Sequence, residues 1–140
     1  MEKTLLIIKP DITKKKLIGK IITIIEENNL LIENIFMLKF KKDDAKLFYK
    51  DHEKKVFFNE LMDFITSDKI IAIILTGENI INKTRKLIGD TNFKNAEKNT
   101  IRAFFATSLT ENAVHASDSI DSAKKEIKII LDLIKENEYQ

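Results

Sequence analysis

Chemistry is indicated most strongly by residues 112–118, which read Asn-Ala-Val-His-Ala-Ser-Asp. His115 is one of two histidines, and its small neighbours Ala113 and Ala116 leave room for a bulky group to approach the imidazole. With an unperturbed pKa of about 6.5, an imidazole is largely neutral at pH 7, and a ring nitrogen can act as a nucleophile. If the stretch is extended, alternation places Ala113, His115 and Ser117 on one face. The alternative is a polar residue at a strand end, without chemistry.

Six other polar residues are candidates for the same site. Taken singly, each could equally be the end of a strand or a solvated charge on a helix. Together they include two arginines, a lysine, a threonine and an asparagine, which suit a polyphosphate because arginine forks match phosphate oxygens. The chain has no glycine-rich phosphate-binding loop, so side chains would have to build any phosphate site. The six candidates are Lys9, Arg85, Thr91, Arg102, Asn112 and Glu126.

The composition limits the classes of protein and of partner. With 140 residues, 44% hydrophobic and 33% charged, the chain is predicted to form one globular domain over residues 1–140. A formal net charge of +2 does not indicate a general nucleic-acid binder or a binder of anionic membranes. The absence of cysteine excludes disulfides and cysteine-ligated metals, and fits a cytoplasmic location. No apolar run has the length of a signal peptide core or a membrane span.

Four stretches are predicted to be strands. Residues 5–8 and 70–75 are continuous apolar runs, which is typical of strands covered on both faces. The proline after Lys9 ends the first of them and puts Lys9 at its carboxyl end. Residues 31–40 are rich in β-forming residues, and the lysines at their end suit an edge strand. The stretch around His115 is the fourth strand.

Helical spacing of apolar residues predicts the first helices. One amphipathic helix is expected over about residues 13–29. A short helix that Asp43 or Asp44 can cap continues to Tyr49. A second short helix follows it, so that a helical pair precedes the strand at residues 70–75. The apolar side of that second helix consists of Phe57, Phe58, Leu61, Met62 and Ile65.

The remaining part of the chain is predicted to contain two further helices and one long loop. A helix over about residues 80–88 ends at the glycine that follows it. Residues 90–99 form the longest loop, and long loops in compact domains are often functional. A short extended piece is expected around residues 102–106. The closing helix is capped by Ser119 or Asp121.

The order of these elements predicts an α+β fold. Without the helical pair and the last helix, the pattern is β-α-β-β-α-β, which is that of ferredoxin-like folds. The expected architecture is therefore a four-stranded antiparallel sheet with helices packed on it, an inserted helical pair and a C-terminal helix. A fold alone does not establish an activity.

Residues 112–118 resemble the active-site signature N-x-x-H-[G/A]-S-D of nucleoside diphosphate kinases. The resemblance continues along nearly the whole chain in order and spacing, from the opening strand through the helical pair to the last helix. One short motif would be a weak signal, whereas this many blocks at compatible spacing are specific. The other matching blocks are residues 8–11, 48–49, 57–61, 89–92, 100–103, 119–123 and 125–127.

The resemblance implies a magnesium-dependent phosphotransferase that works by ping-pong transfer. His115 would take the γ-phosphoryl group of a nucleoside triphosphate, typically ATP, on Nδ1 and pass it to a nucleoside diphosphate. Glu126 would accept a hydrogen bond from the other ring nitrogen, and Ser117 would help to hold that glutamate. Such an enzyme would maintain the pools of NTP and dNTP.

The family's nucleotide contacts can be carried over to matching positions. Lys9 and Asn112 would contact the ribose near its 3′-hydroxyl, and Tyr49 would lie close to the transferring group. Mg²⁺ would be held mainly by substrate phosphates and water, with no dedicated protein ligands. Base specificity would be broad, since stacking discriminates poorly among bases. Arg85, Thr91 and Arg102 would contact the phosphates, and Phe57 and Leu109 would sandwich the base.

The chain departs from the family pattern at several positions, none of which is a catalytic group. These departures bear on loop rigidity and subunit contacts more than on chemistry. The residues concerned are Ile12 in place of glycine, Lys55 and Val56 in place of Arg-Pro, Phe93, Lys98 and Asn99 in the long loop, and Phe104 in place of aspartate.

Alternatives from other classes remain open at this point. One is a non-enzymatic nucleotide-binding or scaffolding protein on the same fold, and another is a weak nucleic-acid binder through the lysines at residues 14–16. His52 is interpreted as a solvated surface residue. The resemblance implies a homo-oligomer, with a hexamer favoured over a tetramer. We expect neither a membrane partner nor a specific nucleic acid.

Overall fold

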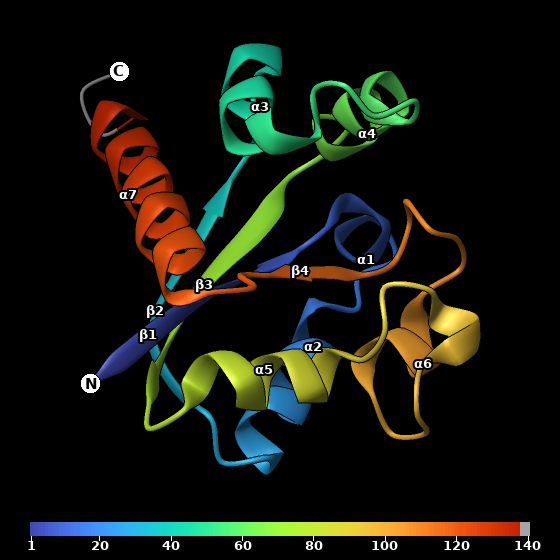
Figure 1. Cartoon of the computed structure of the whole chain (residues 1–140), viewed down its shortest axis with the longest axis vertical. Coiled ribbons are helices and arrows are strands. Elements are labelled where there is room, and N and C mark those ends of the chain that lie inside the picture. The colour runs from blue at the N-terminus through green and yellow to red at the C-terminus, as the bar shows by residue number, and fades with distance from the viewer. Residues whose placement is uncertain (138–140) are drawn as a thin grey trace.

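The computed structural model describes residues 1–137, and its centre is a four-stranded antiparallel sheet (Figure 1). The strands lie in the order β2-β3-β1-β4, and every neighbouring pair is antiparallel. This confirms the predicted α+β architecture and places the predicted edge strand β2 at an edge. The strands are β1 (Glu2–Ile8), β2 (Leu31–Leu38), β3 (Ile70–Gly77) and β4 (Val114–Ala116).

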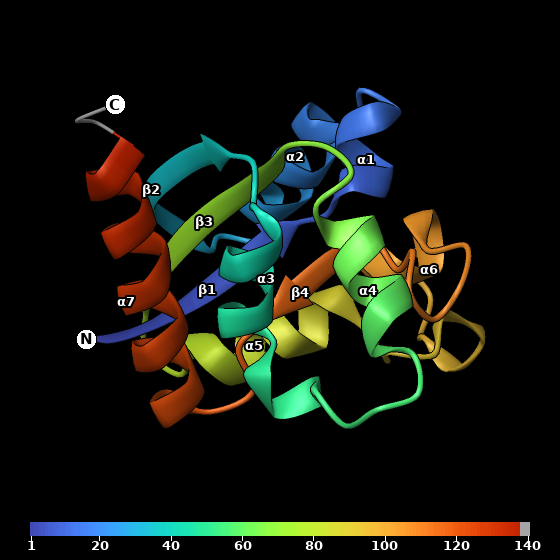
Figure 2. The ribbon, with the colours of Figure 1, turned by 90° about the horizontal axis from the view of Figure 1, so that it is seen from above.

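Helices cover both faces of this sheet. α2 and α5 pack on one face, whereas α3, α4 and α7 pack on the other. Figure 2 shows α7, α3 and α4 side by side over the sheet. The helices are α1 (Pro10–Lys14), α2 (Ile18–Glu27), α3 (Lys42–Phe48), α4 (Phe58–Ile65), α5 (Ile80–Ile88), α6 (Ile101–Phe105) and α7 (Ile120–Asn137), with short 3-10 turns at Lys50–His52 and Phe93–Asn95.

The continuous apolar run in β1 explains the two-sided core. Leu5 and Ile7 belong to the cluster beneath α3, α4 and α7, while Leu6 and Ile8 belong to the cluster beneath α2 and α5. All four side chains are fully buried. Successive side chains of a strand point to opposite faces, so a strand with both faces covered needs apolar residues at every position.

The prediction of one helix over residues 13–29 is wrong, because the segment forms two helices. Lys16 adopts a left-handed conformation with φ of +60°. The Leu17 N–H donates to the Ile12 carbonyl at 3.2 Å, and the Lys16 N–H donates to the Thr13 carbonyl at 3.1 Å. This pair of bonds around a left-handed residue is the Schellman motif, which ends α1 before α2 begins at Ile18.

The prediction of an extended piece around residues 102–106 is also wrong. This segment is the short helix α6, whose N-cap Thr100 accepts a hydrogen bond from the Ala103 N–H at 3.2 Å. A helix of five residues is too short to show a helical repeat of apolar positions, so the period carried no signal here.

Helix caps confirm some predictions and correct another. Ser119 caps α7, because its hydroxyl accepts the Ser122 N–H at 3.0 Å. The N-cap of α3 is Lys41 rather than an aspartate, and the Asp44 carboxylate reaches back to the Lys41 N–H at 2.9 Å. Gly89 ends α5 with φ of +90°, as predicted.

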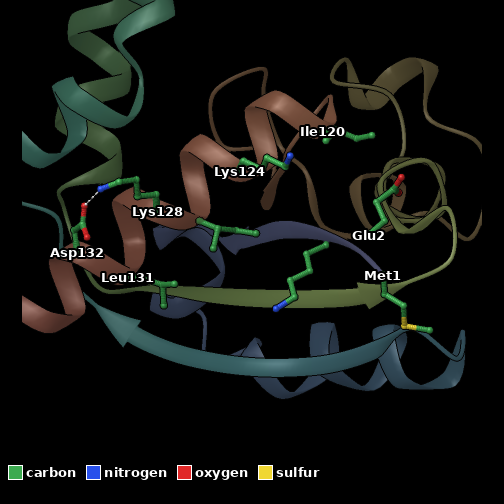
Figure 3. Close-up of a pocket in the computed structure, with 9 residues that line it drawn as sticks. Met1, Glu2, Ile120, Lys124, Lys128, Leu131 and Asp132 are labelled. Carbon is green, nitrogen blue, oxygen red and sulfur yellow. Dashed lines mark hydrogen bonds and ion pairs between the residues drawn. The ribbon is translucent and has the colours of Figure 1, made fainter.

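An apolar groove of about 650 Å³ lies between the start of β1 and α7 (Figure 3). Ile120, Ile127 and Leu131 contribute its apolar wall, and the ion pair between Lys128 and Asp132, 2.8 Å long, lies at one end. None of the predicted site residues lines this groove. Within residues 1–137, no helix is long and apolar enough to cross a membrane.

Candidate active site

His115 lies in the middle of β4, directly opposite Ile7 of β1. Cross-strand partners share a face, so the imidazole points to the side of the sheet that α3, α4 and α7 cover. The ring packs edge-on against Phe48 and Tyr49, with ring centroids 5.3 and 5.8 Å away. Its side chain keeps 19% of its surface exposed, so a ligand can reach it.

Glu126, on α7, orients this imidazole. His115 Nε2 lies 2.8 Å from Glu126 Oε1, and the Ser117 hydroxyl donates to the same oxygen at 2.8 Å. A carboxylate only accepts, so the ring proton belongs on Nε2 and the lone pair remains on Nδ1. Ser117 is fully buried, and its bond therefore fixes the glutamate that in turn fixes the histidine.

A lysine and an asparagine pair beside the start of β4. Lys9 Nζ donates to Asn112 Oδ1 at 2.8 Å, and Asn112 Nδ2 donates to the Leu109 carbonyl at 3.0 Å. Burial of Lys9, together with the positive charge of Arg102, lowers the pKa of Lys9 to about 7, against a smaller raising effect of Asp11. The pair places a buried amine, which titrates near neutral pH, just after the carboxyl end of β1.

Two arginines bind the backbone carbonyls on either side of His115. Arg102, on α6, donates to the Val114 carbonyl at 2.9 Å and to the Gly89 carbonyl at 3.0 Å. Arg85, on α5, donates to the Ala116 carbonyl at 3.3 Å. Burial, followed by the charge of Arg85, lowers the pKa of Arg102 to about 10, so the Arg102 guanidinium is still cationic at neutral pH. The site is therefore suited to an anion.

Two polar atoms of the site have no hydrogen-bond partner among residues 1–137. They are the buried Nε of Arg102 and the buried hydroxyl of Tyr49. Burial, and next the charge of Glu126, raises the pKa of Tyr49, so its hydroxyl keeps its proton. Unpartnered donors in a buried place are costly unless a ligand satisfies them.

Comparisons with known proteins agree on one family. The model of the family described as nucleoside diphosphate kinase matches residues 2–135. The chain is 50% identical over 129 residues to the nucleoside diphosphate kinase of Clostridium perfringens, covering 92% of this chain and 90% of the relative. The chain belongs to the nucleoside diphosphate kinase family. Its activity is that of a nucleoside diphosphate kinase, a phosphotransferase that acts on nucleoside triphosphates and diphosphates.

Solved structures of nucleoside diphosphate kinases have the same fold. The enzyme of Aquifex aeolicus superposes with a TM-score of 0.88 at 40% identity, over 92% of this chain and 94% of that one. The enzyme of Halobacterium salinarum, solved in complex with CDP, gives a TM-score of 0.87 at 32% identity, over 91% and 86% of the two chains. The ferredoxin-like arrangement predicted from the order of elements is thereby confirmed.

The nucleoside diphosphate kinase fold brings most of the predicted site residues together. His115, Glu126, Ser117 and Tyr49 form one contact cluster. Lys9 pairs with Asn112, while Arg85 and Arg102 meet the backbone of β4. These residues lie on α5, α6, β4 and α7, at the end of α3, and in the segments that follow β1 and flank β4, so only the tertiary fold could assemble them.

Three predicted nucleotide contacts lie at the surface. Thr91 is exposed in the loop after Gly89. Phe57 is 45% exposed beside α4, and Leu109 is 64% exposed in the segment before β4. Their contacts with phosphate and base remain predictions.

Sequence reasoning missed the environment of His52, which is wrongly interpreted above as solvated. The side chain is half-buried, and its ring centroid lies 5.9 Å from that of Tyr49. Burial, followed by the charges of Lys55 and His115, lowers the pKa of His52. Its spacing of three residues from Tyr49 on a helical turn is the signal that could have indicated this contact. Phe48, the residue before Tyr49, is a second missed contact of His115.

Proposed function

We propose that this nucleoside diphosphate kinase carries the transferred phosphoryl group on Nδ1 of His115. The observation that supports this most directly is the bond from Nε2 to Glu126, since it leaves the Nδ1 lone pair free. That lone pair would attack the γ-phosphorus of a nucleoside triphosphate. A bond from Nδ1 to phosphorus forms, the bond from that phosphorus to the bridging oxygen breaks, and the nucleoside diphosphate leaves with the electron pair. In the second half-reaction, a terminal oxygen of another diphosphate attacks the phosphohistidine.

Glu126 would stabilise the charge that develops during this attack. The imidazole becomes positive as Nδ1 bonds to phosphorus, and a carboxylate 2.8 Å from Nε2 stabilises that charge. Ser117 would act on the glutamate rather than on the substrate, because its hydroxyl already donates a hydrogen bond to Glu126 Oε1. The Tyr49 hydroxyl, without a partner in residues 1–137, would donate to the transferring group.

The cationic groups around β4 would bind the nucleotide. Arg85 and Arg102 would neutralise the phosphates, since each reaches the backbone beside His115. Lys9 and Asn112, already paired at 2.8 Å, would contact the ribose near its 3′-hydroxyl. We assign Thr91 to the phosphates, and Phe57 and Leu109 to the base.

The substrate would enter as its magnesium complex. Within residues 1–137, no group of three histidine or carboxylate side chains could hold a metal ion. Substrate phosphates and water would hold the Mg²⁺, and the ion would neutralise phosphate charge. We further propose that residues 1–140 form a single domain that works in the cytoplasm as a homo-oligomer, with a hexamer favoured over a tetramer.

Incubation with γ-labelled ATP and magnesium tests the phosphohistidine directly. The native protein should acquire label that is stable in alkali and lost in acid, and His115→Asn should acquire none. His52→Asn is the matched control, since it changes the second histidine within the same region and should retain the label. Label that persists in His115→Asn would contradict the assignment. A native protein that binds ADP and takes no label would contradict the whole proposal.

A further inference from the structure

A strained turn lies two residues before His115. Ala113 has φ of +76°, in the left-handed region that a residue with a Cβ rarely adopts. The Val114 N–H donates to the Asn112 carbonyl at 2.9 Å, which closes a three-residue turn around Ala113. A γ-turn with a positive φ at its centre is rare and strained. Because β4 begins at Val114, this turn sets the direction in which the histidine strand starts.

Two groups from the segment after β1 hold the backbone of Ala113. The carboxylate of Asp11 accepts the Ala113 N–H on Oδ2 at 3.0 Å. The Lys9 N–H donates to the Ala113 carbonyl at 2.9 Å. Pro10 lies between these residues, and its ring fixes the backbone φ there. Both polar groups of the strained residue are thus tied to one short rigid segment.

Burial of the Asp11 carboxylate costs free energy, and a role in stabilising the fold alone would not explain that cost. The side chain is 3% exposed, and its second oxygen, Oδ1, is buried without a hydrogen-bond partner in the described part of the chain. Burial also raises the pKa of Asp11, and the hydrogen bond from the Ala113 N–H lowers it by a smaller amount. A buried carboxylate with an unpaired oxygen costs free energy, so its presence indicates a gain elsewhere. The bond to Ala113 is the contact that links it to the site.

We infer that Asp11 is a positioning residue for phosphoryl transfer, which it serves by holding Ala113 in the strained turn. The turn has a functional residue on each side. Asn112 precedes Ala113 and accepts the Lys9 Nζ bond at 2.8 Å, while His115 lies two residues after Ala113, in β4. If the backbone of Ala113 relaxed to an ordinary conformation, Asn112 would rotate relative to His115. The inference rests on the proposed phosphohistidine at His115.

Two substitutions separate this role from a charge effect on Lys9. Asp11→Asn keeps an oxygen that can accept the Ala113 N–H but removes the negative charge, whereas Asp11→Leu removes both at similar size. The rate of His115 phosphorylation by ATP should stay within about threefold of native in Asp11→Asn. It should fall about 100-fold in Asp11→Leu, which is the loss expected when a reacting group moves by roughly 1 Å. An equal loss in both variants would overturn the inference.

A third substitution tests the strain itself. Glycine adopts a positive φ without the steric cost of a Cβ. In Ala113→Gly the turn should therefore depend less on the hydrogen bond to Asp11. Asp11→Leu should therefore lose at least tenfold less phosphorylation rate in the Ala113→Gly background than in the native background. Equal losses in the two backgrounds would show that Asp11 does not act through the turn. Where Asp11→Leu fails to fold, Asp11→Ala replaces it in both backgrounds.

Controls keep failure of the inference distinct from failure of the proposed function. Thr4→Val removes another buried polar group without a partner in residues 1–137, and it should leave the phosphorylation rate unchanged. Circular dichroism melting reports whether each variant is folded at the assay temperature. If the native protein forms no phosphohistidine, the proposed function fails. If it does, and Asp11→Leu is phosphorylated at the native rate, only the role of Asp11 fails.

Discussion

The imidazole of His115 is prepared for its role by a short chain of hydrogen bonds. Ser117 donates to Glu126, and Glu126 accepts from Nε2, both at 2.8 Å through the same oxygen. Ser117 directly follows β4, and Glu126 lies on α7. The tautomer and the ring orientation are thus determined before a nucleotide arrives, which lowers the reorganisation needed during transfer.

Removal of the charge on Glu126 should slow the transfer without removing the hydrogen bond. In Glu126→Gln, the amide oxygen can still accept from Nε2 but carries no negative charge. The phosphorylation rate should fall about tenfold, since a hydrogen bond to a charged acceptor is worth roughly 1 to 2 kcal/mol more than a neutral one. Rapid quenching with labelled ATP measures the rate. Glu136→Gln, on the exposed end of the same helix, is the control, and a native rate in Glu126→Gln would contradict the role of the charge.

Lys9 should make nucleotide binding sensitive to pH. Burial lowers its pKa to about 7, so the empty site holds a largely neutral lysine at about pH 8. A bound diphosphate favours the charged form, so Lys9 takes up a proton on binding and affinity falls as the pH rises above about 7. Calorimetric titration of ADP at about pH 8, in two buffers of different ionisation enthalpy, measures the uptake. Lys9→Met should show none, and equal uptake in both proteins would exclude Lys9 as the source.

At the scale of the element, predictions succeeded where a pattern was long and failed where a conformation was local. The apolar runs of β1 and β3 and the helical periods of α5 and α7 are long enough to indicate both type and position. The break at Lys16, the strained Ala113 and the five-residue helix α6 lack such a period. A lysine or an alanine in the left-handed region has no dependable sequence signal, unlike glycine or asparagine.

In the site, too, the sequence pattern identified a set of residues but not the contacts that form only in the folded chain. The resemblance to a family identified His115, Glu126, Ser117 and the cationic residues as a set. It could not identify Asp11 as the acceptor for Ala113, because the two residues are 102 positions apart and meet only in the fold. Nor could it identify the burial of His52, which depends on the packing of the turn after α3.

Gly89, at the end of α5, should be one of the least replaceable positions near α6, the element that carries Arg102. Its φ is +90°, and an added Cβ would lie 2.5 Å from Oγ1 and 2.8 Å from Cβ of Thr100, the N-cap of α6. Gly89→Ala should therefore destabilise the protein by about 1 to 3 kcal/mol. Its carbonyl also accepts from Arg102, so affinity for ADP should fall too.

Gly19→Ala supplies the matched comparison, measured by urea unfolding. Gly19 is helical, and an added Cβ would meet nothing within 4 Å. That variant should gain roughly 0.5 to 1 kcal/mol, the usual advantage of alanine over glycine in a helix. If both variants changed stability by the same amount, the contact with Thr100 would not be the cause.

At the scale of the whole molecule, the strand order explains how distant parts of the sequence reach one site. β1 and β4 are neighbours in the sheet, so Lys9 at the end of β1 lies beside the start of β4. α7 then crosses back over β1 and presents Glu126 to His115. The opposite edge of the sheet, β2, takes no part in this site and differs in character. Leu31, Ile35 and Met37 are 63%, 47% and 56% exposed there.

That edge is where we expect the predicted homo-oligomer to form its contact with a second copy of the chain. Ile35 and Met37 pair with Ile73 and Ile71 on the face that α2 and α5 cover, yet they remain about half exposed. Exposed apolar side chains on an unpaired strand edge favour association. The double variant Ile35→Lys and Met37→Lys should shift the mass measured by light scattering toward the 16.2 kDa of one chain.

Val56→Lys tests whether any exposed apolar residue would have the same effect. Val56 is fully exposed between α3 and α4, away from the sheet edge, and its substitution should leave the assembly intact. A native protein with the mass of one chain would contradict the homo-oligomer itself. A double variant that keeps the native mass would place the interface elsewhere, because two buried lysines of like charge facing their copies could not be accommodated at a close contact.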